Sequence, residues 1–241
     1  MARFLDSGDT ALVVEFGDGI DRDVSGQVLT LAQRIADAGI EGIAETVPTF
    51  RSLMVHYDPV RVAAADLRVQ IGALTAGLRA SEQIGRRWRI PACYDRAVGP
   101  DVEDVAARTG LTASQVVECH SSTTYHVYMV GYLPGFPYMG DLPEVLRLPR
   151  RETPRVSIPA CSIAIAMAMT GVYTLDSPGG WHLLGRTPVP IWDLRREPPT
   201  LLAPGDKVRF EPIPLDEYER LLEIARAGRF ALEPESAERS P

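Results

Sequence analysis

Residues 131–140, with the sequence GYLPGFPYMG, constrain the fold of this chain more than any other segment. Proline fixes φ and removes a backbone donor, glycine permits positive φ, and the aromatic side chains bring a large packing surface. A second segment of this kind, SPGGWHLLGRT at residues 177–187, follows further along the chain. Both segments are expected to form rigid loops. Such loops suit a ligand site, and they equally suit structural loops packed on a β-domain.

The length and composition predict a folded chain with two modest domains. With 241 residues, 45% of them hydrophobic, the chain can bury a sizeable core. No apolar stretch reaches the length of a membrane span, and the N-terminus turns acidic at once, without the apolar core of a signal peptide. The three cysteines, Cys93, Cys119 and Cys161, are odd in number and far apart, which suits a reducing compartment. We therefore expect a cytoplasmic protein that does not bind a membrane.

The charge balance and the absent motifs argue against several functions. The formal net charge is −7, from 32 acidic and 25 basic residues, so no general positive field attracts nucleic acid. Lys207 is the sole lysine in the sequence, and no glycine-rich loop ends in Gly-Lys-Ser/Thr. Cys-x-x-Cys and His-Glu-x-x-His patterns are also missing from the sequence, so no metal site is expected.

The hydrophobic pattern of residues 1–85 predicts a small α/β domain. It indicates a strand, a helix, a hairpin and a second helix, at residues 11–16, 24–35, 45–57 and 67–78. A last strand near residues 88–90 would complete a β-α-β-β-α-β order, which is the ferredoxin-like split arrangement. The polar and charged residues 80–87 are the expected linker.

Residues 86–230 predict a second domain of mainly β character. Two short helices are expected to begin at Asp101 and Thr112, the latter with the Thr-x-x-Gln spacing of a capping box. Beyond them, apolar alternation and Pro/Gly turns predict a closed or nearly closed barrel. A last helix is expected from Leu215 to about residue 227, before a polar, frayed tail at residues 231–241. The chain is therefore expected to belong to the α+β class.

Shorter strings of similar character accompany the two loops. They are PACY at 91–94, GPD at 99–101, HS at 120–121, PRRETPR at 149–155, IPA at 158–160 and PGD at 204–206. With the two loops, they resemble the family that includes the B subunit of 5-oxoprolinase, allophanate hydrolase subunit 1 and the KipI-type kinase inhibitors. The resemblance covers most of the chain. It implies a cyclophilin-like, carboxyltransferase-type barrel at 86–230 and a site shared with a second, homologous subunit.

His120 is the candidate catalytic residue. It ends the capping-box helix just before two serines, where an imidazole facing a cleft would move a proton near pH 7. The alternative is a histidine at a helix C-terminus that binds backbone carbonyls. The resemblance favours the catalytic role, because the family usually has histidine at this position.

The candidate substrate-binding residues lie in the loops and between them. Arg155 stands among prolines, where a guanidinium held by rigid backbone suits a carboxylate or phosphate, although a solvent-exposed basic stretch is the alternative. Backbone amides around Ser177 allow close approach of a ligand oxygen. With the resemblance, the predicted set comprises Gly135, Phe136, Pro137, Tyr138, Arg155, Met167, Met169, Ser177, Gly179, Gly180 and Trp181.

Met167 and Met169 are a departure from the family pattern. The family typically carries small and polar residues before the Thr-Gly pair that here follows Met169. Two thioethers in place of a polar amide would make this part of the site larger and more apolar. Alternatively, these positions serve packing only.

The resemblance implies a subunit that is inactive alone and belongs to an ATP-dependent 5-oxoprolinase, which opens 5-oxo-L-proline to L-glutamate. ATP is expected only in the assembled complex, together with a separate hydrolytic subunit and a homologous partner. That partner is expected to resemble the C subunit of 5-oxoprolinase or allophanate hydrolase subunit 2. One alternative is a carboxyltransferase subunit of the urea carboxylase type. Another is a KipI-like inhibitor that docks exposed Phe136, Tyr138 and Trp181 on a sensor histidine kinase.

Overall fold

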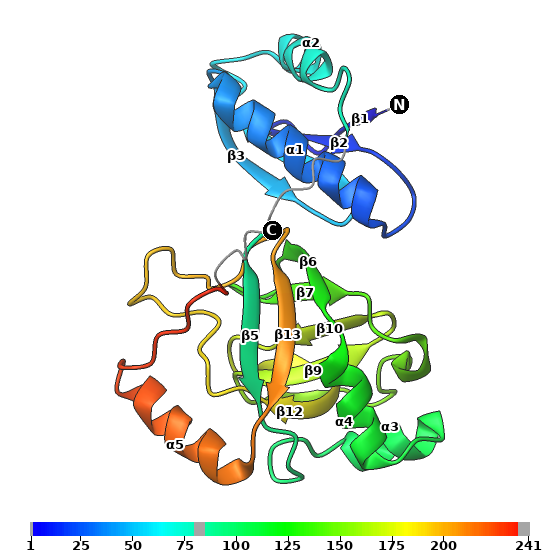
Figure 1. Cartoon of the computed structure of the whole chain (residues 1–241). Coiled ribbons are helices and arrows are strands. Elements are labelled where there is room, and N and C mark those ends of the chain that lie inside the picture. Colours follow the sequence, from blue (N-terminus) through cyan, green and yellow to red (C-terminus); the bar gives the residue numbers. More distant parts are fainter. Residues whose placement is uncertain (1, 80–84, 236–241) are drawn as a thin grey trace, which may run out of the picture. The chain divides into compact units, whose positions relative to one another are not determined.

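The computed structural model describes residues 2–79 and 85–235 and divides the chain into two compact units, Met1–Ile84 and Gly85–Pro241. Figure 1 shows the elements of each unit. Residues 80–84 of the expected linker and residues 236–241 of the expected tail lie outside the described part of the chain.

The first unit is an antiparallel sheet with two helices. Its strands have the order β1-β2-β4-β3 and comprise β1 (Arg3–Asp6), β2 (Ala11–Glu15), β3 (Ile43–Pro48) and β4 (Ser52–Tyr57). Helix α1 (Arg22–Ala38) begins where the Asp21 carboxylate accepts hydrogen bonds from two backbone amides, and it ends at Gly39 with φ 56°. Helix α2 is Ala64–Leu74. Apolar residues of both helices share one core with β2 and β4, which confirms the predicted helices and hairpin.

The second unit is a nearly closed barrel. Its seven-stranded sheet has the order β12-β9-β10-β7-β6-β13-β5. The strands are β5 (Arg87–Ala92), β6 (Tyr125–Val130), β7 (Pro137–Gly140), β9 (Ser162–Ala166), β10 (Met169–Val172), β12 (His182–Arg186) and β13 (Lys207–Pro212). A backbone bridge between Cys93 and Arg186 joins the ends of the two edge strands. The expected α+β class and barrel are confirmed.

The predicted strand near residues 88–90 exists, but its assignment to the first sheet is wrong. It lies within β5, which pairs in parallel with β13 in the barrel (Figure 1). Trp88 and Ile90 are 3% and 0% exposed because they point into the barrel core. The edge of the first sheet beside β2 is instead taken by β1, which the sequence pattern did not predict.

The described part of the second unit also contains three α-helices and a small sheet, and the first two of these helices pack against the barrel. Helices α3 (Val102–Thr109) and α4 (Ala113–Ser122) follow β5, and α4 begins with the predicted Thr112–Gln115 capping box. The two-stranded sheet pairs β8 (Arg155–Ile158) with β11 (Ser177–Gly179). Helix α5 is Leu215–Arg226, close to its predicted bounds, and a short 3-10 turn occupies Glu144–Leu146.

The beginning of the predicted tail is not frayed. The Glu235 amide donates to the Arg87 carbonyl over 2.8 Å, and Phe230 and Leu232 pack against the barrel core. These two apolar side chains anchor residues 230–235 to the barrel. Among the helices of the described residues, none is long and apolar enough to cross a membrane.

Candidate functional site

The two conspicuous loops meet in an aromatic cluster centred on Phe136. The Phe136 ring lies 4.9 Å from Tyr138, 5.3 Å from Tyr173 and 5.7 Å from Trp181, measured between centroids. Phe136 is 1% exposed and Trp181 is 7% exposed. The expectation that these two rings are exposed anchors for a kinase is therefore wrong. We call Tyr132, Phe136, Tyr138, Tyr173 and Trp181 the aromatic cluster.

The glycines of these loops make room for the aromatic rings. A Cβ on Gly179 would lie 2.2 Å from the Tyr173 hydroxyl, and a Cβ on Gly171 would lie 2.8 Å from Phe136. Gly135 has φ 74°, a conformation that favours glycine. Gly171 and Gly179 therefore serve close packing within the cluster, whereas Gly135 packs against Trp192.

The remaining loop residues of the predicted set are also held by the chain itself. Pro137 begins β7 and lies opposite Val130 of β6. The Gly180 carbonyl accepts a hydrogen bond from the Arg151 amide over 2.8 Å, which ties the second loop to the arginine-rich segment. The Ser177 hydroxyl is buried and makes no hydrogen bond within the described residues.

Arg155 is held in an ion pair with Asp101. Its Nη2 atom donates to Asp101 Oδ1 over 2.6 Å, and Arg151 Nη1 lies 3.2 Å from the same oxygen. The other Asp101 oxygen accepts from the Leu183 amide over 2.7 Å. Asp101 is 4% exposed, so this cluster of charges fixes the start of α3 against the barrel. The guanidinium predicted to hold a ligand anion binds a carboxylate of its own chain.

Met167 and Met169 lie at the β9–β10 hairpin. Met167 is 60% exposed and occupies the turn with φ 54°, whereas Met169 is 7% exposed at the start of β10. Strand alternation places Met169 on the same face of β10 as Gly171, which faces Phe136. The structure therefore separates the two methionines, with Met169 on the face of the aromatic cluster.

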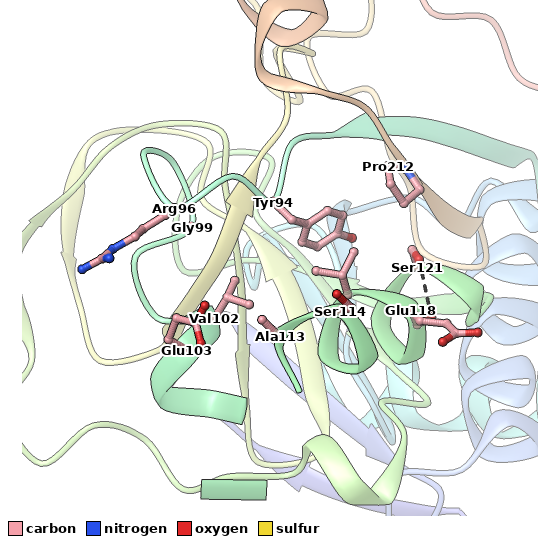
Figure 2. A pocket seen from close by; sticks show the side chains of 11 residues that line it. Tyr94, Arg96, Gly99, Val102, Glu103, Ala113, Ser114, Glu118, Ser121 and Pro212 are labelled. Carbon is pink, nitrogen blue, oxygen red and sulfur yellow. Dashed lines mark hydrogen bonds between the residues drawn. The ribbon is translucent and has the colours of Figure 1, made fainter. Parts of the chain in front are cut away.

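A cavity of about 490 Å³ lies elsewhere, between the end of β5 and helices α3 and α4. Figure 2 shows its lining, with Tyr94 between Glu103 on one side and Glu118 on the other. The lining residues are Tyr94, Arg96, Gly99, Val102, Glu103, Ala113, Ser114, Val117, Glu118, Ser121 and Pro212. Three of the short family strings, PACY, GPD and HS, contribute Tyr94, Gly99 and Ser121 to it. We call it the Tyr94 cavity.

His120 lies behind Tyr94 and does not face the cavity. Its side chain is 0% exposed and stacks on Phe210, with ring centroids 5.0 Å apart. His120 Nδ1 lies 2.7 Å from the Tyr94 hydroxyl, and Nε2 lies 2.9 Å from Thr170 Oγ1. The expectation of an imidazole in a cleft is therefore wrong. The alternative is wrong as well, because both ring nitrogens bind side chains and not backbone carbonyls.

The donor and the acceptor can be assigned in each hydrogen bond between Tyr94, His120 and Thr170. Thr170 Oγ1 donates to the Ala164 carbonyl over 3.1 Å, so it accepts from His120 Nε2–H. His120 Nδ1 then accepts from the Tyr94 hydroxyl. Burial lowers the pKa of His120 to about 3 and raises the pKa of Tyr94 well above its usual value. Both groups are therefore neutral near pH 7, and Tyr94 is held as a fixed phenol at the cavity wall.

The Tyr94 cavity has the features of a small-molecule site. Its wall is apolar at Val102, Val117 and Pro212, and the charged residues Arg96 and Glu103 stand at its rim. Small-molecule sites typically combine a volume of this order with mostly apolar walls and a few polar groups. The described residues contain no group of three His, Cys, Asp or Glu side chains that could hold a metal ion.

The predicted residue set did not include the residues that line this cavity. Tyr94, Gly99 and Ser121 stood in strings that were used for the family resemblance but were not assigned to a site. The signal was available in principle, since three family strings separated in sequence converge on one place. Arg96 and Glu118 carry no such signal, because charged residues of this kind usually mark a solvated surface.

The fold is that of carboxyltransferase-type proteins. The chain belongs to the family "Carboxyltransferase domain, subdomain C and D", whose model matches residues 2–202. It is 36% identical over 222 residues to the 5-oxoprolinase B subunit of Bacillus subtilis, covering 88% of this chain and 92% of that protein. It is 40% identical over 205 residues to the 5-oxoprolinase B subunit of Escherichia coli O157:H7, covering 85% and 93%.

Solved structures share the fold. The crystal structure of TTHA0988 is 37% identical with a TM-score of 0.76, and the match covers 88% of this chain and 40% of that one. The urea amidolyase of K. lactis has a TM-score of 0.79 at 20% identity, covering 97% of this chain and 16% of that one. The chain thus spans nearly all of the 5-oxoprolinase subunits but less than half of these two solved chains.

Proposed function

We propose that this chain is a subunit of an ATP-dependent 5-oxoprolinase, which converts 5-oxo-L-proline to L-glutamate. The observation that carries the proposal is the identity with the 5-oxoprolinase B subunits, which extends over 85% or more of this chain and over more than 90% of the relatives. The burial of Phe136 and Trp181 gives no support to the alternative of a kinase inhibitor that docks through these rings.

The same comparisons support dependence on partner subunits. The relatives are named as subunits, and the matched region is only 40% and 16% of two longer solved chains. We infer that the further polypeptide of those chains corresponds to a separate second subunit here. A separate hydrolytic subunit completes the proposed enzyme.

The Tyr94 cavity is the proposed site for the lactam. The ring methylenes of 5-oxoproline would pack on Val102 and Val117, while its carboxylate would lie at the rim near Arg96, whose exposed side chain points away from Tyr94 in Figure 2 and would turn toward it. A lactam is stabilised by resonance, so its opening needs activation. In the proposed reaction the lactam oxygen attacks the γ-phosphorus of ATP, the bond to the bridging oxygen breaks, and ADP leaves. Water then adds to the activated lactam carbon, the C–N bond breaks with the nitrogen taking up a proton, and inorganic phosphate leaves to give glutamate.

His120 has a positioning role in this scheme. Its Nδ1 atom orients the Tyr94 hydroxyl, which is one of the polar groups of the cavity lining, with those of Ser114 and Ser121, proposed to contact the lactam. Because His120 is neutral and fully buried, it acts through Tyr94 and does not exchange a proton with the substrate. This replaces the role of direct proton donor that the sequence suggested.

Reconstitution tests the proposed function. ATP-dependent glutamate release is measured with this chain alone, with the partner subunits alone and with all of them together. We expect release only from the complete set, with this chain eluting in one complex with its second subunit on gel filtration. Full activity of this chain alone would contradict the proposed dependence, and no release from the complete set would contradict the proposed reaction.

A further inference from the structure

Four cationic side chains stand in register on the outer face of two neighbouring barrel strands. In the parallel pair of β5 and β13, Lys207 lies opposite Arg87 and Arg209 lies opposite Arg89. The residues between them point into the core, because Trp88, Ile90, Val208 and Phe210 are at most 3% exposed. Alternation along each strand therefore directs all four cations to the same, outer face.

This arrangement is electrostatically unfavourable unless an anion is present. Like charges directly opposite each other on paired strands destabilise a sheet, and here two such pairs are adjacent. The chain has a net charge of −7, so the cluster is a local exception to an acidic protein, and it includes the only lysine of the sequence. By contrast, Arg86 nearby is matched by the buried Asp206 carboxylate, with Nη2 and Oδ2 2.8 Å apart.

Glu235, in the C-terminal segment of the described residues, supplies a carboxylate to this cluster. Glu235 pairs with Arg89, and its backbone amide donates to the Arg87 carbonyl over 2.8 Å. Glu235 also lines a small cavity of about 140 Å³ together with the four cations and Thr124. Within the described residues, Arg87, Lys207 and Arg209 form no ion pair, so these three cations leave an excess of positive charge at this cavity. The contact of the Glu235 carboxylate with Arg89 shows that an anionic group can bind at this place.

The small cavity continues into a larger groove that reaches the Tyr94 cavity. Arg89 and Arg209 also line a groove of about 530 Å³, whose other walls include Glu211 as well as Glu118, Ser121 and Pro212. The latter three residues line the Tyr94 cavity as well. A ligand with its phosphates on the cations would therefore extend along α4 toward the Tyr94 cavity.

We propose that this cationic cluster binds the phosphate groups of a nucleoside triphosphate, with the sugar and base in the adjoining groove. Arginine and lysine recognise phosphate by charge-assisted hydrogen bonds, and the groove offers the acceptors Glu118 and Ser122 to sugar or base hydrogens. The inference deepens the proposed function, because it places ATP beside the Tyr94 cavity and rests on the use of ATP by the enzyme. Glu235 competes with the phosphates for Arg89.

Titration calorimetry with the full chain tests the site, with ATP, inorganic phosphate and adenosine as separate probes. We expect the double variant Lys207→Ala/Arg209→Ala to weaken ATP binding at least tenfold, and Glu235→Gln to tighten it several-fold. Inorganic phosphate should compete with ATP, and adenosine should bind far more weakly than ATP. The control is Arg220→Ala, which removes an exposed arginine paired with Glu217 on α5 and should leave ATP binding unchanged.

The outcomes separate this inference from the proposed function. Unchanged ATP binding in the double variant overturns the proposed site. If the double variant binds ATP normally but no longer assembles with its partner, the proposed site is also overturned, and the cationic cluster is a protein interface instead. A complex that turns over 5-oxoproline equally well with and without the four cations also overturns it, while leaving the proposed function intact. If the chain binds ATP through the cluster but the complete complex releases no glutamate, the proposed function fails and the site stands. Because all four positions are on the surface, Lys207→Gln/Arg209→Gln serves as a second variant if alanine affects folding.

Discussion

The aromatic cluster and the Tyr94 cavity differ in how their residues are used. In the cluster, rings pack against each other at centroid distances of 4.9–5.8 Å around Phe136, and the nearby glycines have no room for a side chain. Around the cavity, apolar side chains from two helices leave about 490 Å³ open, and charged groups stand at its rim. The segments that are most conspicuous in the sequence thus form the more closely packed region.

The difference has a physical reason. Close packing of aromatic rings against backbone leaves few permitted residues at each position, so it produces long strings of glycine, proline and aromatic residues. A small-molecule cavity needs only a few polar groups on ordinary elements, so its residues are scattered along the chain. The two regions are nevertheless connected. Arg155 lies opposite Gly179, which abuts Tyr173 of the cluster, and it pairs with Asp101 just before Val102 of the cavity wall.

Truncation of Phe136, the central ring of the cluster, should give the largest difference in stability between the two regions. Phe136→Ala removes a 1% exposed ring and is expected to lower the free energy of unfolding of the barrel by about 3–5 kcal/mol. Val117→Ala, in the half-buried cavity wall, should lower it by less than about 1 kcal/mol. All three tryptophans lie in the second unit, so urea unfolding followed by tryptophan fluorescence reports on the barrel alone. Equal losses of unfolding free energy in the two variants would contradict the claim that the cluster is more closely packed than the cavity wall.

The buried imidazole behind Tyr94 predicts a pH dependence. The pKa of His120 is about 3 in the folded chain, below its ordinary value of 6.5, so the unfolded chain binds the additional proton. Its contribution to stability is fully present above pH 6.5 and is lost as pH falls toward 3. Between pH 7 and pH 5 the wild type should lose about 2 kcal/mol more than His120→Gln, which does not titrate. Parallel losses in urea titrations of both proteins would show that the imidazole is accessible to protons in the fold.

The smallest expected effect concerns the hairpin turn. Met167 has φ 54°, which is unfavourable for any residue with a Cβ, so Met167→Gly should stabilise the barrel by about 0.5–1 kcal/mol. Ala168→Gly in the same turn, at a residue without positive φ, should instead destabilise it by a similar amount. Thermal unfolding of the two variants provides the measurement. A loss of stability in Met167→Gly would mean that the exposed thioether contributes more than the turn conformation.

The sequence predicted the helices and strands better than it predicted the tertiary contacts between them. The capping box at Thr112, the glycine C-cap of α1 and the alternating barrel strands are local patterns, and they were confirmed. The partner of β5 was predicted wrongly because the strand pairs with β13, more than a hundred residues later, and local alternation does not specify a partner. His120 was identified as an unusual residue, but its burial depends on Phe210 and Thr170, which no local pattern connects to it.

Blocking the Tyr94 cavity tests the central claim, that the ligand site is this cavity and not the aromatic cluster, most directly. Ser114 is exposed in the first turn of α4 and lines the cavity, so Ser114→Trp should fill it without disturbing the core. Tyr132→Trp adds similar bulk at a 61% exposed position of the cluster. We predict that Ser114→Trp lowers kcat/KM for 5-oxoproline in the assembled complex at least tenfold, with assembly and barrel stability unchanged, and that Tyr132→Trp has little effect. Normal turnover in Ser114→Trp together with loss of turnover in Tyr132→Trp would contradict the claim.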